Sequence, residues 1–444
     1  MSLDKLLHEA LARIKPSGEE ERQMRCVARE VIEKVNSAAR DMGLDVYAIH
    51  VGSTARDTWL RGKKDIDIFL MFPPDTSREM LEEDGLRLAR IVSPEFEERY
   101  AEHPYITAVY QGLEVDLVPC YHVPDAAHIQ SAVDRSPFHN QYVLAHIDGK
   151  YDQVRLLKEF TMGVGVYGSE LRTQGFSGYL CELLVIKYGS FMGVLEHGAG
   201  FRLGKVIDLE GRMDPSVEHS DPLVVIDPVD PKRNVAAALS EQKLCEFIDA
   251  CRRFLNAHSL RFFFPDPVVP VTTEGLKRII ESRGTLLLAI SFKAPDIVED
   301  TLYPQLRKAE TSVISLLERH EFKAYRGDVW SDDRSAIVLE MLLWELPAIE
   351  RHFGPPVQER EHSEKFKIKY PQAYIIGCRY AVDLPRRYEN AVDLIRGQLQ
   401  SCGLGKQVAV SIAEGFEVLA GEDTLELGPD FAAFLTGFLR DPGP

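Results

Sequence analysis

The chain has 444 residues, of which 45% are hydrophobic and 27% charged, and its formal net charge at pH 7 is −17. This length predicts about three domains, and the ordinary apolar content excludes a wholly disordered chain. The first 15 residues contain no long apolar segment and no run of about 18 apolar residues follows, which predicts a cytoplasmic protein with no membrane partner. The acidic total disfavours nucleic acid as a partner, unless a local basic patch binds it.

The N-terminal region mixes helices with short strands. Apolar residues at helical spacing predict a helix over residues 17–40, and Gly43 lies just past its end. A turn at residues 148–150 ends the region. Between this helix and the turn we expect a strand at residues 46–51, a short helix at 54–60 and a second strand at 65–72. A hairpin across Gln111-Gly112 is expected to pair residues 105–110 with 113–119.

From about residue 151 the pattern becomes mostly helical, and beyond Pro265 strand-like runs alternate with helices. The C-terminal end reads as a helix and an acidic loop. The clearest expected helices lie at residues 178–191, which are strongly apolar, at 240–257 and at 303–319. An acidic loop is expected at residues 210–221 and a strand at 285–292. The predicted domains are therefore residues 1–150, 151–262 and 263–444.

Seven cysteines are scattered along the chain, and none forms a Cys-x-x-Cys pair. An odd number at such spacings argues against a disulfide framework and against a zinc site. Reduced thiols in the cytoplasm are the simplest interpretation.

Two aspartates share one face of the strand predicted at residues 65–72. Side chains at i and i+2 of a strand point the same way, so Asp65 and Asp67 present two carboxylates side by side. Like charges this close are usually stable only with cations between them, and oxygen-rich sites suit magnesium. Asp116 interrupts a buried-strand pattern at residues 113–118 and would find its partner in the same metal site.

The Gly52-Ser53 turn comes between a predicted strand and a predicted helix. Its backbone N–H groups and the helix N-terminus can hold phosphate oxygens, and the Ser53 hydroxyl adds a donor. With the three aspartates this makes a triphosphate site with two metals, suited to in-line displacement at phosphorus. Each part alone has a simpler interpretation, as a helix cap, a solvated strand face or a turn-facing carboxylate. The conjunction of the Gly-Ser turn with the three aspartates is much more specific for such a site.

A basic stretch lies at residues 365–370, where lysines alternate with apolar or aromatic residues. The lysines are Lys365, Lys367 and Lys369. A period of two predicts a strand with one basic face and one apolar face. Two interpretations stay open: an edge strand protected by its lysines, or a strip that meets RNA phosphates.

The order Gly-Ser, Asp-x-Asp and a later Asp resembles the DNA polymerase β-like nucleotidyltransferase superfamily. Residues 52–62 followed by 65–69 look like one branch, the archaeal class I CCA-adding enzymes, which are tRNA nucleotidyltransferases. The likeness spans roughly residues 40–310 and has mild departures at Asp65 and Ser136, where the family also has Glu and Thr. The other strings that match are residues 134–139, 154–158, 166–168, 175–184, 225–236, 295–298 and 302–306.

The resemblance implies an α+β fold: a polymerase β-like nucleotidyltransferase catalytic domain, a helical central domain and a mixed α/β RNA-binding C-terminal region. It implies template-independent addition of C, C and A to the 3′ end of tRNA from CTP and ATP, and repair of damaged CCA ends. The tRNA 3′-hydroxyl would attack the α-phosphate with two magnesium ions, Mg2+ being the cofactor, and pyrophosphate would leave. A homodimer is also implied.

The resemblance further implies a role for each matching residue. Asp65, Asp67 and Asp116 would ligate magnesium and carry catalysis. The residues implied to contact the nucleotide are Ser53, Arg56, His139, Lys158 and Tyr167, with Arg233 and Asn234 on the base side. The C-terminal region, with Lys365, Lys367 and Lys369, would bind the acceptor and TΨC arms. Taken singly, Lys158, His139 and Tyr167 also fit a solvated lysine, a half-buried histidine and a loop-packing residue.

Two other functions fit part of the pattern. A poly(A)-adding enzyme, or another RNA nucleotidyltransferase of the superfamily, would use the same three aspartates but make a long tail instead of three nucleotides. A non-catalytic tRNA-binding protein would have no need of three intact aspartates.

Overall fold

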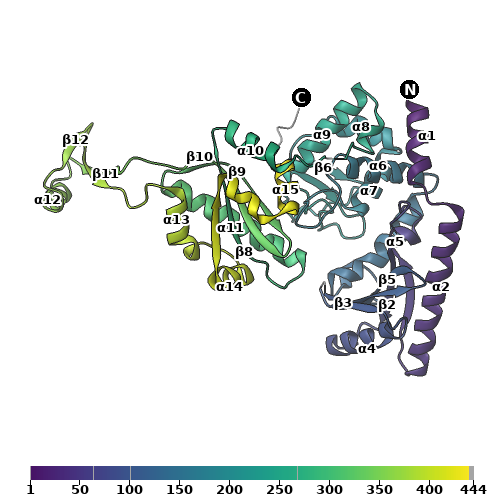
Figure 1. Cartoon of the computed structure of the whole chain (residues 1–444). Coiled ribbons are helices and arrows are strands. Elements are labelled where there is room, and N and C mark those ends of the chain that lie inside the picture. The colour runs from purple at the N-terminus through teal and green to yellow at the C-terminus, as the bar shows by residue number, and fades with distance from the viewer. Residues whose placement is uncertain (1, 64, 101, 268, 440–444) are drawn as a thin grey trace. The chain divides into compact units, whose positions relative to one another are not determined.

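The computed structural model describes residues 2–63, 65–100, 102–267 and 269–439, coloured along the chain in Figure 1. The chain divides into two units, Met1–Asp266 and Pro267–Pro444. The fold is α+β, as the resemblance implies, with a sheet-containing N-terminal part, a helical middle and a C-terminal part with sheets. The separation of the first unit into domains at residue 150 stays a prediction.

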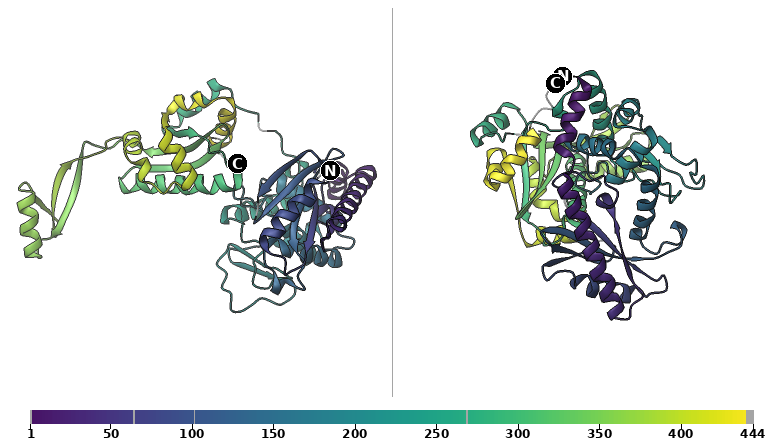
Figure 2. Two further views of the ribbon diagram at one scale, coloured as in Figure 1. Left: turned by 90° about the horizontal axis from the view of Figure 1, so that it is seen from below. Right: turned by 90° about the vertical axis from the view of Figure 1, so that its right-hand side faces the viewer.

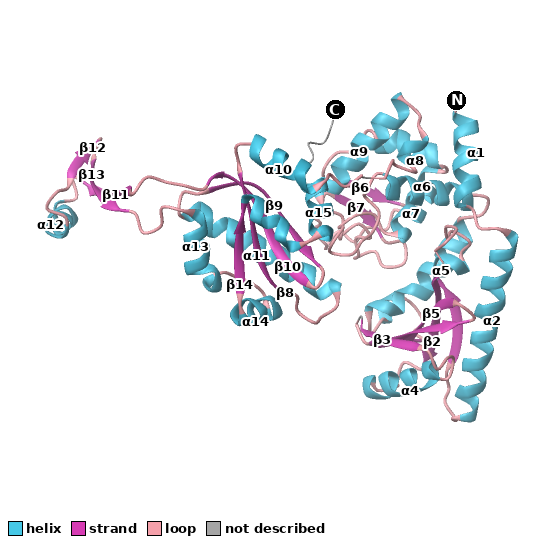
Figure 3. Ribbon diagram, in the orientation of Figure 1, coloured by secondary structure: helices cyan, strands magenta, loops and turns pink. Residues whose placement is uncertain are grey.

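A five-stranded sheet forms the N-terminal part, in the order β1-β2-β5-β4-β3. Figure 3 draws its strands in magenta. The β2–β5 pair is parallel, and the other neighbours are antiparallel. The predicted strand at residues 65–72 is confirmed with the same bounds, and the predicted hairpin is confirmed as β4 and β5. The strands are β1 (Tyr47–Val51), β2 (Asp65–Phe72), β3 (Phe96–Tyr100), β4 (Pro104–Tyr110) and β5 (Leu113–Tyr121).

One face of this sheet packs on α2 (Gly18–Asp41) and α4 (Arg78–Arg90). Ile66, Ile68 and Leu70 of β2 are fully buried in that core. Because side chains alternate along a strand, Asp65 and Asp67 lie on the opposite face. The apolar alternation of β2 therefore turns both carboxylates away from the core.

The middle part is a layer of helices around an aromatic-rich core, with a two-stranded parallel sheet of β6 (Lys205–Asp208) and β7 (Leu223–Ile226). Leu6, Ala10 and Ile14 of the first helix belong to this core. The predicted helix at residues 240–257 is confirmed. The helices are α1 (Leu3–Ile14), α5 (Ser136–His146), α6 (Tyr151–Gly163), α7 (Gly178–Tyr188), α8 (Phe191–Gly198) and α9 (Glu241–Asn256).

Two predicted helices of the first unit have the wrong bounds. The apolar helix expected over residues 178–191 ends at Tyr188, because Gly189 adopts a left-handed φ of +83° and stops it. The short helix expected over residues 54–60 is instead the single turn α3 (Gly52–Ala55). Among the described residues no single helix is long and apolar enough to cross a membrane. One pair, α7 with α8, bent by 92°, passes that test on length and composition alone.

The second unit has a four-stranded sheet in the order β14-β8-β10-β9. The strand predicted at residues 285–292 and the helix predicted at 303–319 are confirmed as β8 and α11. The C-terminal end also holds a strand, β14, that the sequence did not predict. These elements are β8 (Leu286–Lys293), β9 (Lys323–Ser331), β10 (Arg334–Leu343), β14 (Phe416–Ala420), α10 (Thr273–Ser282), α11 (Glu299–Arg319), α13 (Ala391–Gln398), α14 (Lys406–Glu414) and α15 (Pro429–Leu439).

An arm projects from this unit, with α12 at its far end (Figures 1 and 2). It contains a three-stranded sheet in the order β11-β13-β12. The arm comprises β11 (Ile349–Pro356), α12 (Arg360–Lys369), β12 (Tyr374–Ile376) and β13 (Arg379–Pro385).

The strand predicted at residues 365–370 is wrong, because these residues form the end of α12 and the C-cap that follows. Two pairs at i,i+4, Arg360–Glu364 at 3.2 Å and Glu361–Lys365 at 2.7 Å, stabilise the helix locally. At helical spacing Lys365 and Lys369 share a face, whereas Lys367 points elsewhere, 5.5 Å from the Tyr380 ring centroid. The continuous basic strip is therefore absent.

Candidate active site

The three predicted carboxylates come from adjacent strands. In the parallel β2–β5 pair Asp67 lies directly opposite Asp116, and Asp65 lies opposite Glu114. Paired residues project on the same face, so Asp67 and Asp116 are neighbours above the sheet. Thr107 of β4 donates a hydrogen bond to Asp116 Oδ1 at 2.6 Å and fixes one side of that carboxylate.

The carboxylates lie in an environment that penalises negative charge. Burial, followed by the charge of Asp116, raises the pKa of Asp67 to about 7. Burial also raises the pKa of Asp116, against the lowering effect of its hydrogen bond from Thr107. A divalent cation would remove this penalty, and the all-oxygen donor set fits magnesium or a similar ion. As the side chains stand, however, no group of three or more metal-ligating residues in the described ranges is gathered closely enough to hold one.

Gly52 allows Asp67 to lie against the turn. Its φ of +79° is left-handed, and a Cβ at this position would lie 2.8 Å from the Asp67 carboxyl carbon. A residue with a side chain would be strained there and would displace the carboxylate. The turn predicted at residues 52–53 is thus present, but the helix after it is only one turn long.

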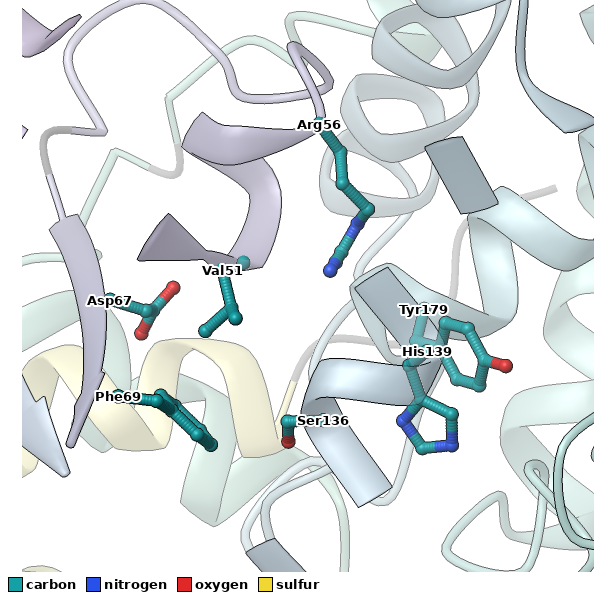
Figure 4. Close-up of a pocket in the computed structure, with 8 residues that line it drawn as sticks. Val51, Arg56, Asp67, Phe69, Ser136, His139 and Tyr179 are labelled. Carbon is teal, nitrogen blue, oxygen red and sulfur yellow. The ribbon is translucent and has the colours of Figure 1, made fainter. Parts of the chain in front are cut away.

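Two cavities lie beside this turn. The first, of about 190 Å³, is surrounded by Arg56, Asp67 and His139, which Figure 4 shows together. Its complete lining is Val51, Gly52, Arg56, Asp67, Phe69, Ser136, His139 and Tyr179. The second, of about 430 Å³, is lined by Ser53, Trp59, Leu60, Lys63, Asp65, Lys158, Met162 and Tyr167. Five predicted nucleotide contacts therefore line the two cavities, whereas Arg233 and Asn234 line neither.

Arg56 and Lys158 meet at a buried carboxylate. Glu182 of α7 is fully buried, and its Oε1 accepts hydrogen bonds from Arg56 Nε at 3.1 Å and Thr58 Oγ1 at 2.5 Å. Lys158 Nζ lies 3.7 Å from the same oxygen and donates to the Thr58 carbonyl at 3.1 Å. Burial alone would raise the pKa of Glu182, but Arg56 and Lys158 outweigh it and hold the pKa below its usual value. The solvated-lysine interpretation of Lys158 is excluded, because the residue is only 3% exposed.

A second buried carboxylate, Asp227, organises the far side of the smaller cavity. Its Oδ2 accepts from His139 Nε2 at 2.8 Å and Arg233 Nη1 at 2.9 Å, and its Oδ1 accepts from the Tyr179 hydroxyl at 3.3 Å. The His139 and Tyr179 rings stack with centroids 4.1 Å apart. Burial acts to raise the pKa of Asp227, but its hydrogen bond and ion pair with His139 keep the pKa below its usual value.

Asn234 holds the loop that carries Arg233. Its Oδ1 accepts from the backbone N–H groups of Val225 and Ala236, at 2.8 and 2.9 Å. Its Nδ2 donates to Asp221 and to the Leu223 carbonyl, both at 2.9 Å. All four hydrogen-bonding positions of the amide are used, so the structure gives Asn234 a place in the loop and not one facing a nucleotide.

Glu182, Asp227 and Tyr179 are three residues of the site that the sequence did not predict. All three lie in strings that carried the resemblance, at residues 175–184 and 225–236, so that signal was present. Glu182 is embedded in an apolar helix and Asp227 follows an apolar strand. Apart from Lys158 and Arg233, their partners lie more than 40 residues away in the sequence, so spacing alone gave neither residue a role.

Comparison with known proteins gives consistent matches along the chain. Three family models match in order: a nucleotidyltransferase domain at residues 32–139, the second domain of tRNA nucleotidyltransferase at 152–264, and the C-terminal domain of CCA-adding enzyme at 283–421. The chain is 46% identical to a CCA-adding enzyme of Methanosarcina acetivorans over 437 residues, which covers 96% of each chain. It is 42% identical to one of Methanothermobacter thermautotrophicus over 441 residues, which covers 97% of each.

Similarity to solved structures is more distant. The structure of E. coli MS115-1 CdnC with ATP matches at 22% identity with a TM-score of 0.46, over 59% of this chain and 93% of that one. No functional conclusion follows from a likeness of this degree.

Proposed function

The chain belongs to the family of CCA-adding enzymes, and from that premise we propose that it adds C, C and A to the 3′ end of tRNA. CTP and ATP are the proposed nucleotide substrates, and pyrophosphate is the proposed leaving group. We extend the proposal to repair of damaged CCA ends. A cytoplasmic location and a homodimer are part of the same proposal.

The observation that supports this chemistry best is the placement of Asp67. It lies opposite Asp116, two residues from Asp65, and against a turn at Gly52 that has no side chain. In our proposal these aspartates hold divalent metal ions, which we take to be Mg2+. Such ions neutralise phosphate charge and act as Lewis acids at phosphorus.

The chain's own cations supply the remaining positive charge. Arg56 faces the smaller cavity and Lys158 the larger one, so both are placed to bind oxygens of a triphosphate. Ser53 and Tyr167 add hydroxyl donors on the side of Lys158. Each of these residues binds and orients the nucleotide so that its α-phosphate lies beside the aspartates.

The far wall of the smaller cavity is proposed to receive the ribose and base. His139 lies there, held by Asp227, and Arg233 shares the same carboxylate. The Arg233 side chain is 38% exposed, so part of its guanidinium can donate to a ligand. Asn234 is proposed to act only through the loop that carries Arg233.

The arm of the second unit is proposed to contact tRNA. Lys365 and Lys369 lie on one face of α12 and are exposed. Lys367 is less favourably placed, since it lies on another face of the helix, beside Tyr380. Contacts of this kind read phosphates and helix shape, which suits the acceptor and TΨC arms of any tRNA.

The test is incubation with tRNA that lacks CCA, together with Mg2+ and each labelled NTP alone and in mixture. We expect two C residues and then one A, with a stop after three nucleotides. Incorporation of UTP as readily as CTP, or an A tail without C, would refute the proposal. A long A tail would indicate a poly(A)-adding enzyme, and tRNA binding without turnover a non-catalytic protein.

A further inference from the structure

One buried carboxylate joins the two cations that flank the Gly52–Ser53 turn. Arg56 lines the smaller cavity with Asp67, and Lys158 lines the larger one with Asp65. The two cavities have no lining residue in common. Both cations nevertheless contact Glu182, whose Oε2 also lies 3.1 Å from Arg56 Nη2.

Residues 56–59, which follow the Gly52–Ser53 turn, are held by α6 and α7. Thr58 is fully buried and bridges the cluster, because its hydroxyl donates to Glu182 Oε1 and accepts from Lys158 Nζ at 3.2 Å. Next to it, Arg155 of α6 donates to the Trp59 carbonyl at 3.1 Å. Residues 56–59 are therefore tied to α6 and α7 at several points.

The charges of this cluster do not cancel. Arg56, Lys158 and Glu182 carry two positive charges and one negative charge when ionised, all in side chains at most 10% exposed. A buried excess of positive charge is unfavourable unless an anion lies nearby. Asp67 and Asp65, which line the same cavities as Arg56 and Lys158, provide part of that negative charge, and the phosphates of a nucleotide in these cavities would add to it.

We propose that Glu182 is a positioning residue for the nucleotide, which sets Arg56 and Lys158 on the two sides of the turn. This inference rests on the proposed function, because it assumes that the cavities receive a nucleoside triphosphate. Glu182 itself touches no nucleotide, since it is fully buried. It acts through the two cations, and Thr58 fixes its carboxylate between them.

The test measures CTP affinity with Mg2+, in the full-length protein and without tRNA. Glu182→Gln keeps the size of the side chain but removes its charge and turns an amide donor toward two cations. We expect the Kd for CTP to rise about tenfold, as for the loss of a buried charge-assisted contact. Glu182→Asp keeps the charge and should recover part of the affinity. Thr58→Val should shift the Kd in the same direction by a smaller factor.

A double-mutant cycle separates positioning from a general loss of structure. If Glu182 acts through Arg56, Glu182→Gln should weaken CTP binding much less in an Arg56→Ala background than in the wild type. If the two substitutions weaken CTP binding independently, so that their effects on the Kd multiply, the proposal is overturned. An unchanged CTP Kd in Glu182→Gln would overturn it as well.

Glu340→Gln is the matched control. Glu340 is also a buried carboxylate held by two arginines, Arg283 and Arg326, but it lies in the second unit. It should lose thermal stability and keep the wild-type CTP Kd. If Glu340→Gln weakens CTP binding as much as Glu182→Gln, the effect is one of stability and the proposal fails. Failure of the wild-type protein to extend tRNA would refute the proposed function instead, whereas the CTP affinities test Glu182 separately.

Discussion

Replacing Gly52 by alanine should reduce the catalytic rate strongly and the stability of the fold only slightly. The backbone at Gly52 has φ +79°, which costs an L-residue about 1–2 kcal/mol. An alanine Cβ would also overlap Asp67 Oδ2 and lie 2.8 Å from the Asp67 carboxyl carbon, so Asp67 or the turn must move by more than about 1 Å to reach ordinary contact. A displacement of that size at a reacting centre costs about 10²-fold in rate. We therefore expect Gly52→Ala to lower kcat for CMP incorporation about a hundredfold.

Gly43→Ala provides the control for backbone strain. Gly43 has a similar φ of +70°, but a Cβ there would meet nothing within 4 Å. Both variants should lower Tm by about 2–8 °C, from the same strain energy. Only Gly52→Ala should lose activity on tRNA that lacks CCA. Wild-type kcat in Gly52→Ala, or an equal loss in Gly43→Ala, would show that the contact between the turn and Asp67 does not determine the rate.

Further outcomes are expected at four other places. Asp116→Ala should abolish nucleotide incorporation and leave the Kd for tRNA within about twofold, as a gel-shift titration would show; retained activity would refute the metal-ligand assignment. Asp227→Asn should lower kcat/KM for CTP about tenfold, because His139 and Arg233 lose the carboxylate that they share. Burial acts to raise the pKa of Glu340, but two arginines and Thr285 hold the pKa below its ordinary value of 4.5. The stability from Glu340 should thus be present above about pH 4.5 and be lost as the pH falls through its lower folded-state pKa, so the acid-side loss in Tm should be smaller in Glu340→Gln. Lys365→Glu with Lys369→Glu should weaken tRNA binding and reduce its salt dependence, measured by filter binding at several salt concentrations; unchanged binding would exclude α12 as a contact.

The parts of the site that depend on local periodicity could be predicted from the sequence. Asp65 and Asp67 alternate with isoleucines at residues 66 and 68, which puts both carboxylates on the face of β2 opposite the isoleucines buried in the core, as observed. The apolar pattern and turn residues likewise gave the β4–β5 hairpin that carries Asp116. A period of two is a property of the strand itself, so no tertiary contact is needed to infer it.

Short segments were harder to assign, because competing local patterns are nearly balanced. Residues 365–369 alternate like a strand, yet they form the end of α12. The helix is stabilised by ion pairs at i,i+4, Glu361–Lys365 and Arg360–Glu364. A short helix was expected over residues 54–60. It ends after one turn, and residues 56–59 instead bond to α6 and α7.

Only the tertiary structure determined which distant side chains share a site. The register that puts Asp67 opposite Asp116 joins residues 49 apart, and the bond between Arg56 and Glu182 joins residues 126 apart. No sequence period spans such distances, because they depend on how the sheet and helices pack. The sequence by itself therefore determined the aspartates, the glycine turn and the family. The fold decided that Glu182 and Asp227 would hold the residues around the nucleotide cavities, since a buried charge finds its partners only when the elements pack together.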